Sequence, residues 1–202
     1  MDGNGGITVK IAYVVGIAGG SASGKSTFSE QLKQGLAGLT VSVLSMDAYY
    51  RDSEERPRTA APITGIVYKD ANHPDAFDLE KMTADLKNTA ADGNTDVVLA
   101  EGLFTLWHPP LFELLDLKLF IDCRADERIV RRLKRNRQWG LEFDEIAAVY
   151  LDLVRYRHDE FVEPSRWKAD FILNGSRPSV QALEMLTRHI QMEADKLNKE
   201  RD

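Results

Sequence analysis

The sequence predicts an α/β fold in which a parallel sheet of about five strands carries helices on both faces. Short apolar runs alternate along the chain with longer segments of helical periodicity. The runs are continuous rather than alternating, as expected for strands that are buried on both faces. Residues that could take part in binding or catalysis follow the first three runs directly, at the edge of the sheet where such folds bind their ligands. A chain of 202 residues can form one domain with a sizeable core, so we expect a single domain over residues 1–202.

Each expected element rests on a local pattern. The five strands are the apolar runs at 9–17, 41–46, 97–100, 117–121 and 171–173. Helical spacing of apolar residues predicts helices over 26–36 and 143–154, and a C-terminal helix striped by Leu183, Leu186, Ile190 and Leu197. Two more helices are expected, one over 79–91 and a very basic one over 126–137. Asp78 is the expected N-cap of the helix over 79–91, and Gly93 closes it. Residues 1–8 are expected to be flexible, and residues 51–77, rich in charge and proline, are expected to form a loop.

The composition excludes several classes of protein. The formal net charge is −6 and the isoelectric point is about 5.3, which disfavours a dedicated nucleic-acid binder. Cys123 is the one cysteine, so no internal disulfide can form, and a reducing cytoplasm is the expected location. The sequence shows neither a signal-peptide pattern nor an apolar stretch of membrane-spanning length, so we expect no membrane association.

A nucleotide-binding motif follows the first strand. The eight residues 19–26 read GGSASGKS and match the pattern G-x-x-x-x-G-K-S/T, the Walker A sequence or P-loop. Glycines allow backbone N–H groups to approach phosphate oxygens, and the helix that follows presents its free N–H groups to the anion. Lys25 is then expected to reach the β- and γ-phosphates, and the Ser26 hydroxyl to bind Mg²⁺. The expected phosphate-binding residues are Gly19, Gly20, Ser21, Ala22, Ser23, Gly24, Lys25, Ser26 and Thr27. The fold class is therefore narrowed to a P-loop NTPase that uses ATP and Mg²⁺.

Two carboxylates follow the next two strands of the expected site. Asp47 comes directly after the second strand, where it could accept a proton from an attacking hydroxyl, or simply cap a turn. Glu101 ends the third strand, where P-loop enzymes place an acid that contacts Mg²⁺ directly or through a neighbour, although such an acid can also be a solvated loop residue. Together these positions favour phosphoryl transfer to a hydroxyl group.

A basic segment over residues 125–140 is expected to form a helical lid. Its six basic side chains allow three interpretations. They face phosphate groups in a lid, they form a solvated helix face, or they bind nucleic acid. At helical spacing only some can point to one site, and Arg128, Arg132 and Arg135 share one side. The segment is short and the chain is acidic overall, which favours the phosphate-facing lid.

Several segments together resemble the uridine kinase family, within the phosphoribulokinase and uridine kinase group. These segments are GIAGGSASGKST at 16–27, MDAYYR at 46–51, NHPDAFD at 72–78, VVLAEG at 97–102, KLFIDCRADERIVRRLKR at 118–135 and FVEPSRWKADFIL at 161–173. They occur in family order over roughly residues 10–190. The resemblance implies a uridine or uridine/cytidine kinase that phosphorylates the nucleoside 5′-hydroxyl, and a homo-oligomer.

The resemblance also implies roles for particular residues. Asp47 corresponds to the catalytic base, and Tyr50 to a tyrosine that shapes the nucleoside pocket. Arg132 and Arg135 correspond to lid arginines that reach the transferring phosphate or the acceptor. Arg132 and Asn72 are therefore expected, with Tyr50, on the substrate side, and Ser26 with Glu101 on the Mg²⁺ side.

The chain departs from the family pattern at the acceptor pocket. Asn72 stands where the family has an aspartate that binds the ribose hydroxyls, and an amide binds a diol without charge. Ala71 replaces an aromatic residue, and Val149 replaces a glutamine. A family insert before the third strand is missing at residues 91–96. A kinase of the same fold with another acceptor, such as a sugar, pantothenate or another nucleoside, is the alternative function.

Overall fold

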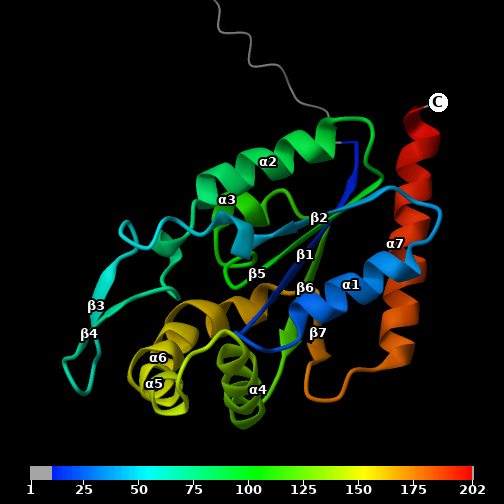
Figure 1. Cartoon of the computed structure of the whole chain (residues 1–202). Helices are drawn as coiled ribbons and strands as arrows, with labels where there is room; N and C mark the ends of the chain where they lie inside the picture. The colour runs from blue at the N-terminus through cyan, green and yellow to red at the C-terminus, as the bar shows by residue number, and fades with distance from the viewer. Residues whose placement is uncertain (1–10, 202) are drawn as a thin grey trace, which may run out of the picture.

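The computed structural model describes residues 11–201 and places a five-stranded parallel sheet at the centre of the molecule (Figure 1). The strand order is β2-β5-β1-β6-β7. The strands are β1 (Tyr13–Gly19), β2 (Val41–Ser45), β5 (Val97–Gly102), β6 (Leu117–Asp122) and β7 (Phe171–Asn174). The prediction of an α/β fold with about five parallel strands is confirmed.

The two middle strands are buried along their whole length, which explains their uninterrupted apolar sequences. Every residue of β1 and of β5 is buried. Successive β1 side chains face opposite layers, because a strand alternates its faces. Val14 packs into the core on one side of the sheet, and Val15 into the core on the other.

Helices cover both faces of the sheet (Figure 1). One face packs against α1 (Lys25–Gly35) and α7 (Val180–Arg201), which contribute Leu32, Leu186 and Ile190 to the core. The other packs against α2 (Leu79–Ala91) and the short α3 (Pro109–Phe112), which contribute Met82, Leu86 and Leu111. The periodic apolar residues on α1 and α7 therefore form the faces that their spacing predicts.

The predicted basic lid is a helix at the carboxyl edge of the sheet. It is α4 (Ala125–Gln138), and α5 (Phe143–Val149) follows it. The chain then stays helical through residues 150–168. Two π-helical segments flank α6 (Arg155–Arg157), and a 3₁₀ segment follows them. Figure 1 shows α4, α5 and α6 gathered at the end of the sheet where β1 finishes.

The expectation that residues 51–77 form an irregular loop was wrong. The segment contains an antiparallel hairpin of β3 (Arg58–Ala60) and β4 (Val67–Lys69), and a tight helical turn at Pro74–Ala76. Each strand has only three residues, which is too short for a detectable period. The hairpin is attached to the rest of the molecule by side chains: Thr64 and Tyr68 both donate hydrogen bonds to Asp152, at 2.8 and 2.9 Å.

Other boundaries differ from the sequence-based expectation only slightly. The first strand begins at Tyr13 rather than at residue 9, and the flexible tail expected at residues 1–8 lies outside the described residues. No helix within residues 11–201 is both long and apolar enough to cross a bilayer. The single-domain organisation of residues 1–202 stays a prediction.

The start of α2 offers a test of local stability. Asp78 accepts a hydrogen bond from the Lys81 main-chain N–H at 3.0 Å, as predicted for an N-cap. We expect Asp78→Ala to lower the free energy of unfolding by about 1 kcal/mol, because one N–H at the helix start loses its acceptor. Denaturant titration would measure the loss. Lys81→Ala is the matched control, since it keeps the N–H, and an equal loss in the control would contradict the capping role.

Candidate active site

The glycine-rich motif forms the loop between β1 and α1. Gly24 and Ala22 both adopt left-handed backbone conformations, with φ of 101° and 62°. Glycine adopts this region freely, whereas Ala22 pays a strain of about 1–2 kcal/mol. Such strain is typical of loops that are shaped for a ligand. No described side chain caps the start of α1, so its first N–H groups and positive dipole end are available to an anion.

A cleft lies between this loop and α4, and it brings together residues that the sequence placed far apart. The buried Lys25 lines the cleft beside Ser26, and Asp47 and Arg135 line it from two other elements. The complete lining is Ala22, Gly24, Lys25, Ser26, Thr27, Asp47, Arg131, Arg135 and Trp139. The predicted phosphate-binding loop, base candidate and one lid arginine therefore share one space.

The proposed metal-side residues, Ser26 and Glu101, are in direct contact. Parallel pairing sets Glu101 opposite Ile17 on one neighbouring strand and opposite Ser45 on the other. The hydroxyls of Ser26 and Ser45 donate to Glu101 Oε1 at 3.1 and 2.6 Å. The second oxygen, Oε2, is buried and has no hydrogen-bond partner among the described residues. A buried, unsatisfied carboxylate oxygen beside a hydroxyl fits a hard cation such as Mg²⁺.

These two residues do not form a complete protein cage for a metal. Within residues 11–201, no group of three or more His, Cys, Asp or Glu side chains is arranged to hold an ion. Mg²⁺ characteristically takes one or two protein ligands and completes its shell with water and substrate phosphates. The donor set therefore suits a metal that arrives with a nucleotide.

Asp47 lies at the rim of the cleft, in the tight helical turn Met46–Tyr49 that follows β2. Its carboxylate is exposed. The preceding Met46 is buried against Gly102, where an added Cβ would lie 2.3 Å from the Met46 Cβ. The glycine after Glu101 thus allows the turn that carries Asp47 to pack closely on the end of β5.

Two arginines of α4 reach back to the nucleotide loop. Arg132 donates to the Ser21 hydroxyl at 2.9 Å, and Arg135 donates to the same oxygen at 3.3 Å. Arg128, which is also buried, approaches Gly20 so closely that a Cβ there would lie 2.4 Å from its guanidinium. Burial, and then the charge of Arg135, lower the pKa of Arg132. The three arginines predicted to share one side of the helix therefore all face the nucleotide loop.

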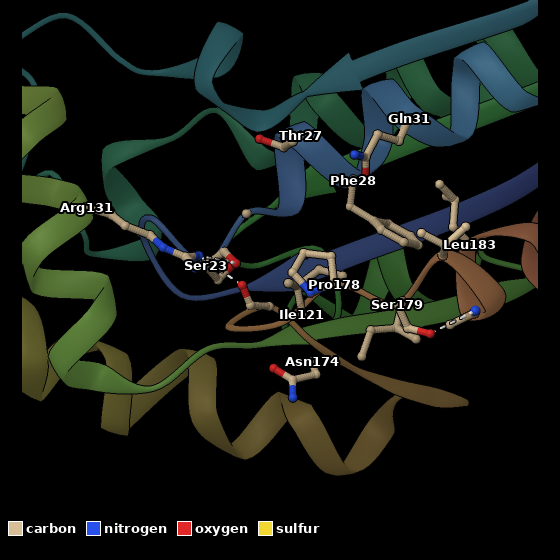
Figure 2. A pocket seen from close by; sticks show the side chains of 15 residues that line it. Ser23, Thr27, Phe28, Gln31, Ile121, Arg131, Asn174, Pro178, Ser179 and Leu183 are labelled. Atoms are coloured by element: carbon tan, nitrogen blue, oxygen red, sulfur yellow. Dashed lines mark hydrogen bonds between the residues drawn. The ribbon is translucent and has the colours of Figure 1, made fainter.

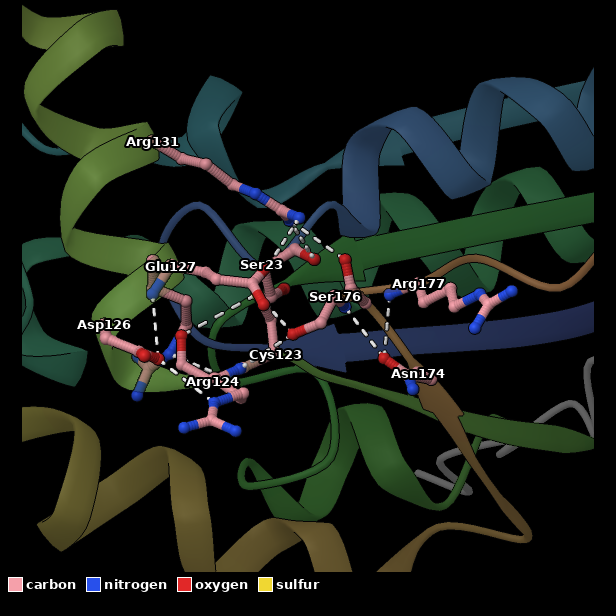
Figure 3. A network of polar contacts seen from close by, with 11 residues as sticks. Ser23, Cys123, Arg124, Asp126, Glu127, Arg131, Asn174, Ser176 and Arg177 are labelled. Atoms are coloured by element: carbon pink, nitrogen blue, oxygen red, sulfur yellow. Dashed lines mark hydrogen bonds and ion pairs between the residues drawn. The ribbon is translucent and has the colours of Figure 1, made fainter.

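Arg131 makes contacts that the sequence did not predict. It donates to the Gly175 carbonyl at 3.0 Å, and its guanidinium also pairs with Glu127 at 3.1 Å (Figure 3). Gly175 is packed so closely on the nucleotide loop that an added Cβ would lie 2.4 Å from the Ser23 carbonyl oxygen. Arg131 therefore ties α4 to the loop after β7, at a residue where only glycine fits.

The tyrosine expected in the acceptor pocket is largely enclosed by protein. The ring of Tyr50 packs on Phe77 with a centroid separation of 4.1 Å, and the Arg56 guanidinium lies 4.6 Å from the Tyr50 ring centre. Its hydroxyl donates to the Ala71 carbonyl at 3.1 Å. Burial and the negative charge of Asp47 raise the pKa of Tyr50 to about 12. Tyr50 thus stays neutral, and its hydroxyl binds within the chain, on the Ala71 carbonyl.

Asn72 lies beside a second, smaller pocket. The residues that line this pocket are Ser21, Asn72, Leu103, Arg128, Val154, Arg157, His158 and Val162. His158 stays neutral, because burial and the charge of Arg128 lower its pKa to about 4. His73 has a local structural contact: its Nδ1 accepts a hydrogen bond from the Asp75 N–H at 3.2 Å and caps a helical turn.

Sequence reasoning missed a pocket beside the nucleotide loop. It has a volume of about 210 Å³ and lies between α1, the end of β6 and the segment that leads into α7 (Figure 2). Its walls include the apolar side chains of Phe28, Ile121, Pro178, Val180 and Leu183. No motif marks these residues, because they come from three separate segments that only folding brings together. Figure 2 shows Thr27 and Ser23 of the nucleotide loop beside it, so it borders the phosphate cleft.

Comparison with known proteins finds matches along nearly the whole chain. The family model described as "Phosphoribulokinase / Uridine kinase family" matches residues 14–94 and 86–181. A uridine kinase of Staphylococcus aureus (strain JH9) is 33% identical over 206 residues, covering 91% of this chain and 97% of that protein. The likeness to the uridine kinase family is therefore confirmed.

Solved structures support the fold. A candidate fructose transport system kinase from Silicibacter sp. aligns with a TM-score of 0.62 at 19% identity, over 85% of this chain and 92% of that one. Phosphoribulokinase from Rhodobacter spheroides aligns with a TM-score of 0.58 at 13% identity, over 85% of this chain and 75% of that one. With the nucleotide loop, the sheet order and the family match in agreement, the chain belongs to the phosphoribulokinase/uridine kinase family of kinases.

Proposed function

We propose that this chain is a uridine kinase, or a uridine/cytidine kinase, that transfers the γ-phosphoryl group of ATP to the nucleoside 5′-hydroxyl. The observation that carries the proposal is the single cleft that joins Lys25, Ser26, Asp47 and Arg135. The identity of 33% to a uridine kinase over almost the full length of both chains supports uridine as the acceptor.

The geometry supports a division of labour between two sides of the cleft. The nucleotide loop and Lys25 bind the phosphates of ATP, and the pocket next to the loop receives the adenine between apolar side chains such as Phe28 and Leu183. Ser26 and Glu101 would hold Mg²⁺, which would neutralise phosphate charge. Acceptor contacts come from Tyr50, Asn72 and Arg132.

Phosphoryl transfer then proceeds by an in-line displacement. The acceptor hydroxyl oxygen forms a bond to the γ-phosphorus while the bond to the bridging oxygen breaks, and ADP leaves. Asp47 accepts the proton of the hydroxyl. Lys25, Arg132 and Arg135 supply positive charge to the equatorial oxygens, where the transition state carries its negative charge.

A second acceptor class is supported by the same pocket. Asn72, Ala71 and Val149 stand where the family has ribose- and base-contacting residues, and the chain passes from α2 into β5 through only the five residues 92–96. A sugar, pantothenate or another nucleoside is therefore the alternative acceptor of a kinase with the same phosphoryl-transfer residues.

Three further proposals accompany this function. We expect no nucleic-acid ligand, given the acidic composition. We expect a cytoplasmic enzyme, for which the single, buried thiol of Cys123 is suitable. We expect a homo-oligomer, as the family resemblance implies, and light scattering of the purified chain would test this.

The acceptor is identified by measuring ADP release with purified protein, ATP and a panel of hydroxyl compounds. We expect uridine or cytidine to stimulate ADP release and to yield the nucleoside 5′-monophosphate, because the phosphoryl-transfer residues are complete. Clear stimulation by a sugar or by pantothenate, with none by either pyrimidine nucleoside, would replace the proposal with its alternative. Omitting the protein is the control for non-enzymatic hydrolysis.

Replacing the proposed base tests its role directly. We expect Asp47→Asn to lower kcat by roughly 10²–10⁴-fold, the usual contribution of a general base. ATP affinity should stay unchanged, since the phosphate contacts remain. The matched control is Asp52→Asn, which removes an exposed carboxylate five residues away. A kcat near the unmodified value in the Asp47 variant would exclude Asp47 as the base.

The role of Glu101 is tested through the metal. Glu101→Gln keeps an oxygen for the Ser26 and Ser45 hydroxyls but removes the negative charge. We expect the Mg²⁺ concentration for half-maximal rate to rise roughly 10–100-fold, as for residues that hold or orient a metal. Nucleotide binding in the presence of a chelator should be unaffected. A metal dependence equal to that of the unmodified protein would place Glu101 outside the metal site.

A further inference from the structure

A buried ion pair connects the acceptor-side segment to the helices after the lid. Asp70, which is fully buried, accepts a hydrogen bond from Arg157 Nε at 2.7 Å. Asp70 follows the hairpin strand β4, and Arg157 is the last residue of α6. Figure 1 shows the hairpin lying beside α5 and α6. The pair therefore joins two segments that are 87 residues apart in the sequence.

All three nitrogens of the Arg157 guanidinium are engaged by protein. The second nitrogen donates to the Thr59 hydroxyl on β3 at 3.1 Å, and the third forms a short contact with Glu160. Burial alone would lower the pKa of Arg157, but its hydrogen bonds to Asp70 and Glu160 raise it. Three of the five guanidinium N–H groups are used in this way, so Arg157 links Asp70, Thr59 and Glu160 and holds these residues in place.

The ion pair determines the position of Asn72. The second Asp70 oxygen accepts a hydrogen bond from the Asn72 main-chain N–H at 3.0 Å, and this contact fixes the turn between them. From the opposite side, the Tyr50 hydroxyl binds the Ala71 carbonyl at 3.1 Å. The turn 70–72 is therefore held at Asp70 and at Ala71, and Asn72 lines the small pocket that Ser21 and Arg128 also line.

We propose that Arg157 is a positioning residue for the acceptor: through Asp70 it holds Asn72 in the orientation that binds the acceptor hydroxyls. This inference rests on the proposed function, because it takes Asn72 as an acceptor contact. The nucleotide side is attached to another element, since Arg132 and Arg135 of α4 bind Ser21 of the nucleotide loop. Loss of Arg157 should therefore affect the acceptor and leave ATP unaffected.

The test compares kinetic constants for the two substrates, using the acceptor that the ADP-release panel identifies. We expect Arg157→Met to raise the acceptor KM roughly tenfold or more, with kcat changed less than about threefold and the KM for ATP unchanged. Methionine keeps the length and apolar stem of the side chain. Arg157→Lys keeps the charge but not the planar guanidinium group. Its acceptor KM should therefore lie between that of the unmodified protein and that of Arg157→Met.

A second variant guards against loss of folding. Arg157→Met leaves the Asp70 carboxylate buried without its partner, which is strongly destabilising. The double variant Asp70→Asn/Arg157→Met leaves no unpaired buried charge, because the other partner of Arg157, Glu160, is exposed to solvent, and the amide oxygen can still accept from the Asn72 N–H. We expect this double variant to fold and to show the same selective rise in acceptor KM, because Asn72 is no longer tied to α6.

Asp152→Asn is the matched control. Asp152 anchors the same hairpin, through Thr64 and Tyr68, but it makes no contact with the turn 70–72 among the described residues. We expect its acceptor KM to stay within about twofold of the unmodified protein, since only hairpin attachment changes. A rise equal to that of the Arg157 variants would assign the effect to the hairpin as a whole and overturn the positioning role.

Other outcomes are equally decisive. If the folded Arg157 variants lose only thermal stability, or if both KM values rise together, the ion pair is structural and the inference is wrong. If the panel identifies a sugar or pantothenate instead of uridine, the proposal of a nucleoside acceptor is wrong. The KM comparison is then made with the compound that the panel identifies. If the unmodified protein releases no ADP with any acceptor, the proposed function fails, and the inference fails with it.

Discussion

Parallel pairing of β5 with β1 on one side and β2 on the other brings Ser26, Asp47 and Glu101 to one edge of the sheet. The register places Glu101 next to Ile17 and Ser45, so the ends of three strands meet at one edge of the sheet. Ser26, one residue into α1, then meets Glu101 at 3.1 Å. A register shift of one residue in β5 would turn Glu101 to the opposite face of the sheet and remove this contact. The apolar side chains that bury both faces of β5 oppose such a shift, so the core and the site depend on the same pairing.

The lid adds positive charge to this edge at an electrostatic cost. Arg132 and Arg135 approach the same Ser21 oxygen, and the charge of Arg135 contributes to the lowered pKa of Arg132. Two guanidinium groups held together in a partly buried place repel one another, and an anion between them relieves that repulsion. The arrangement is therefore better suited to a phosphate-bearing ligand than to stability of the chain alone. Trp139 supports it from the side, with its ring centre 5.0 Å from the Arg135 guanidinium carbon.

The acceptor side is built on different supports. The turn 70–72 depends on Arg157, Tyr50 and the short hairpin, none of which touches the metal-side residues Ser26 and Glu101. The turn that carries Asn72 is thus supported independently of Ser26 and Glu101. Residues of this turn can therefore be substituted without disturbing the contact between Ser26 and Glu101.

The sequence alone was enough to predict the five parallel strands, the nucleotide loop and the carboxylates at the strand ends, because each has a local signal: a continuous apolar run, a fixed glycine spacing, or an acid directly after a strand. Helical spacing also predicted that Arg128, Arg132 and Arg135 share one face. Only the tertiary structure revealed the hairpin, the Asp70–Arg157 pair and the apolar pocket beside the loop. These features join segments far apart in the chain, and their stability comes from side-chain contacts that no local pattern encodes. Whichever compound the acceptor pocket selects, that choice depends on contacts of this second kind.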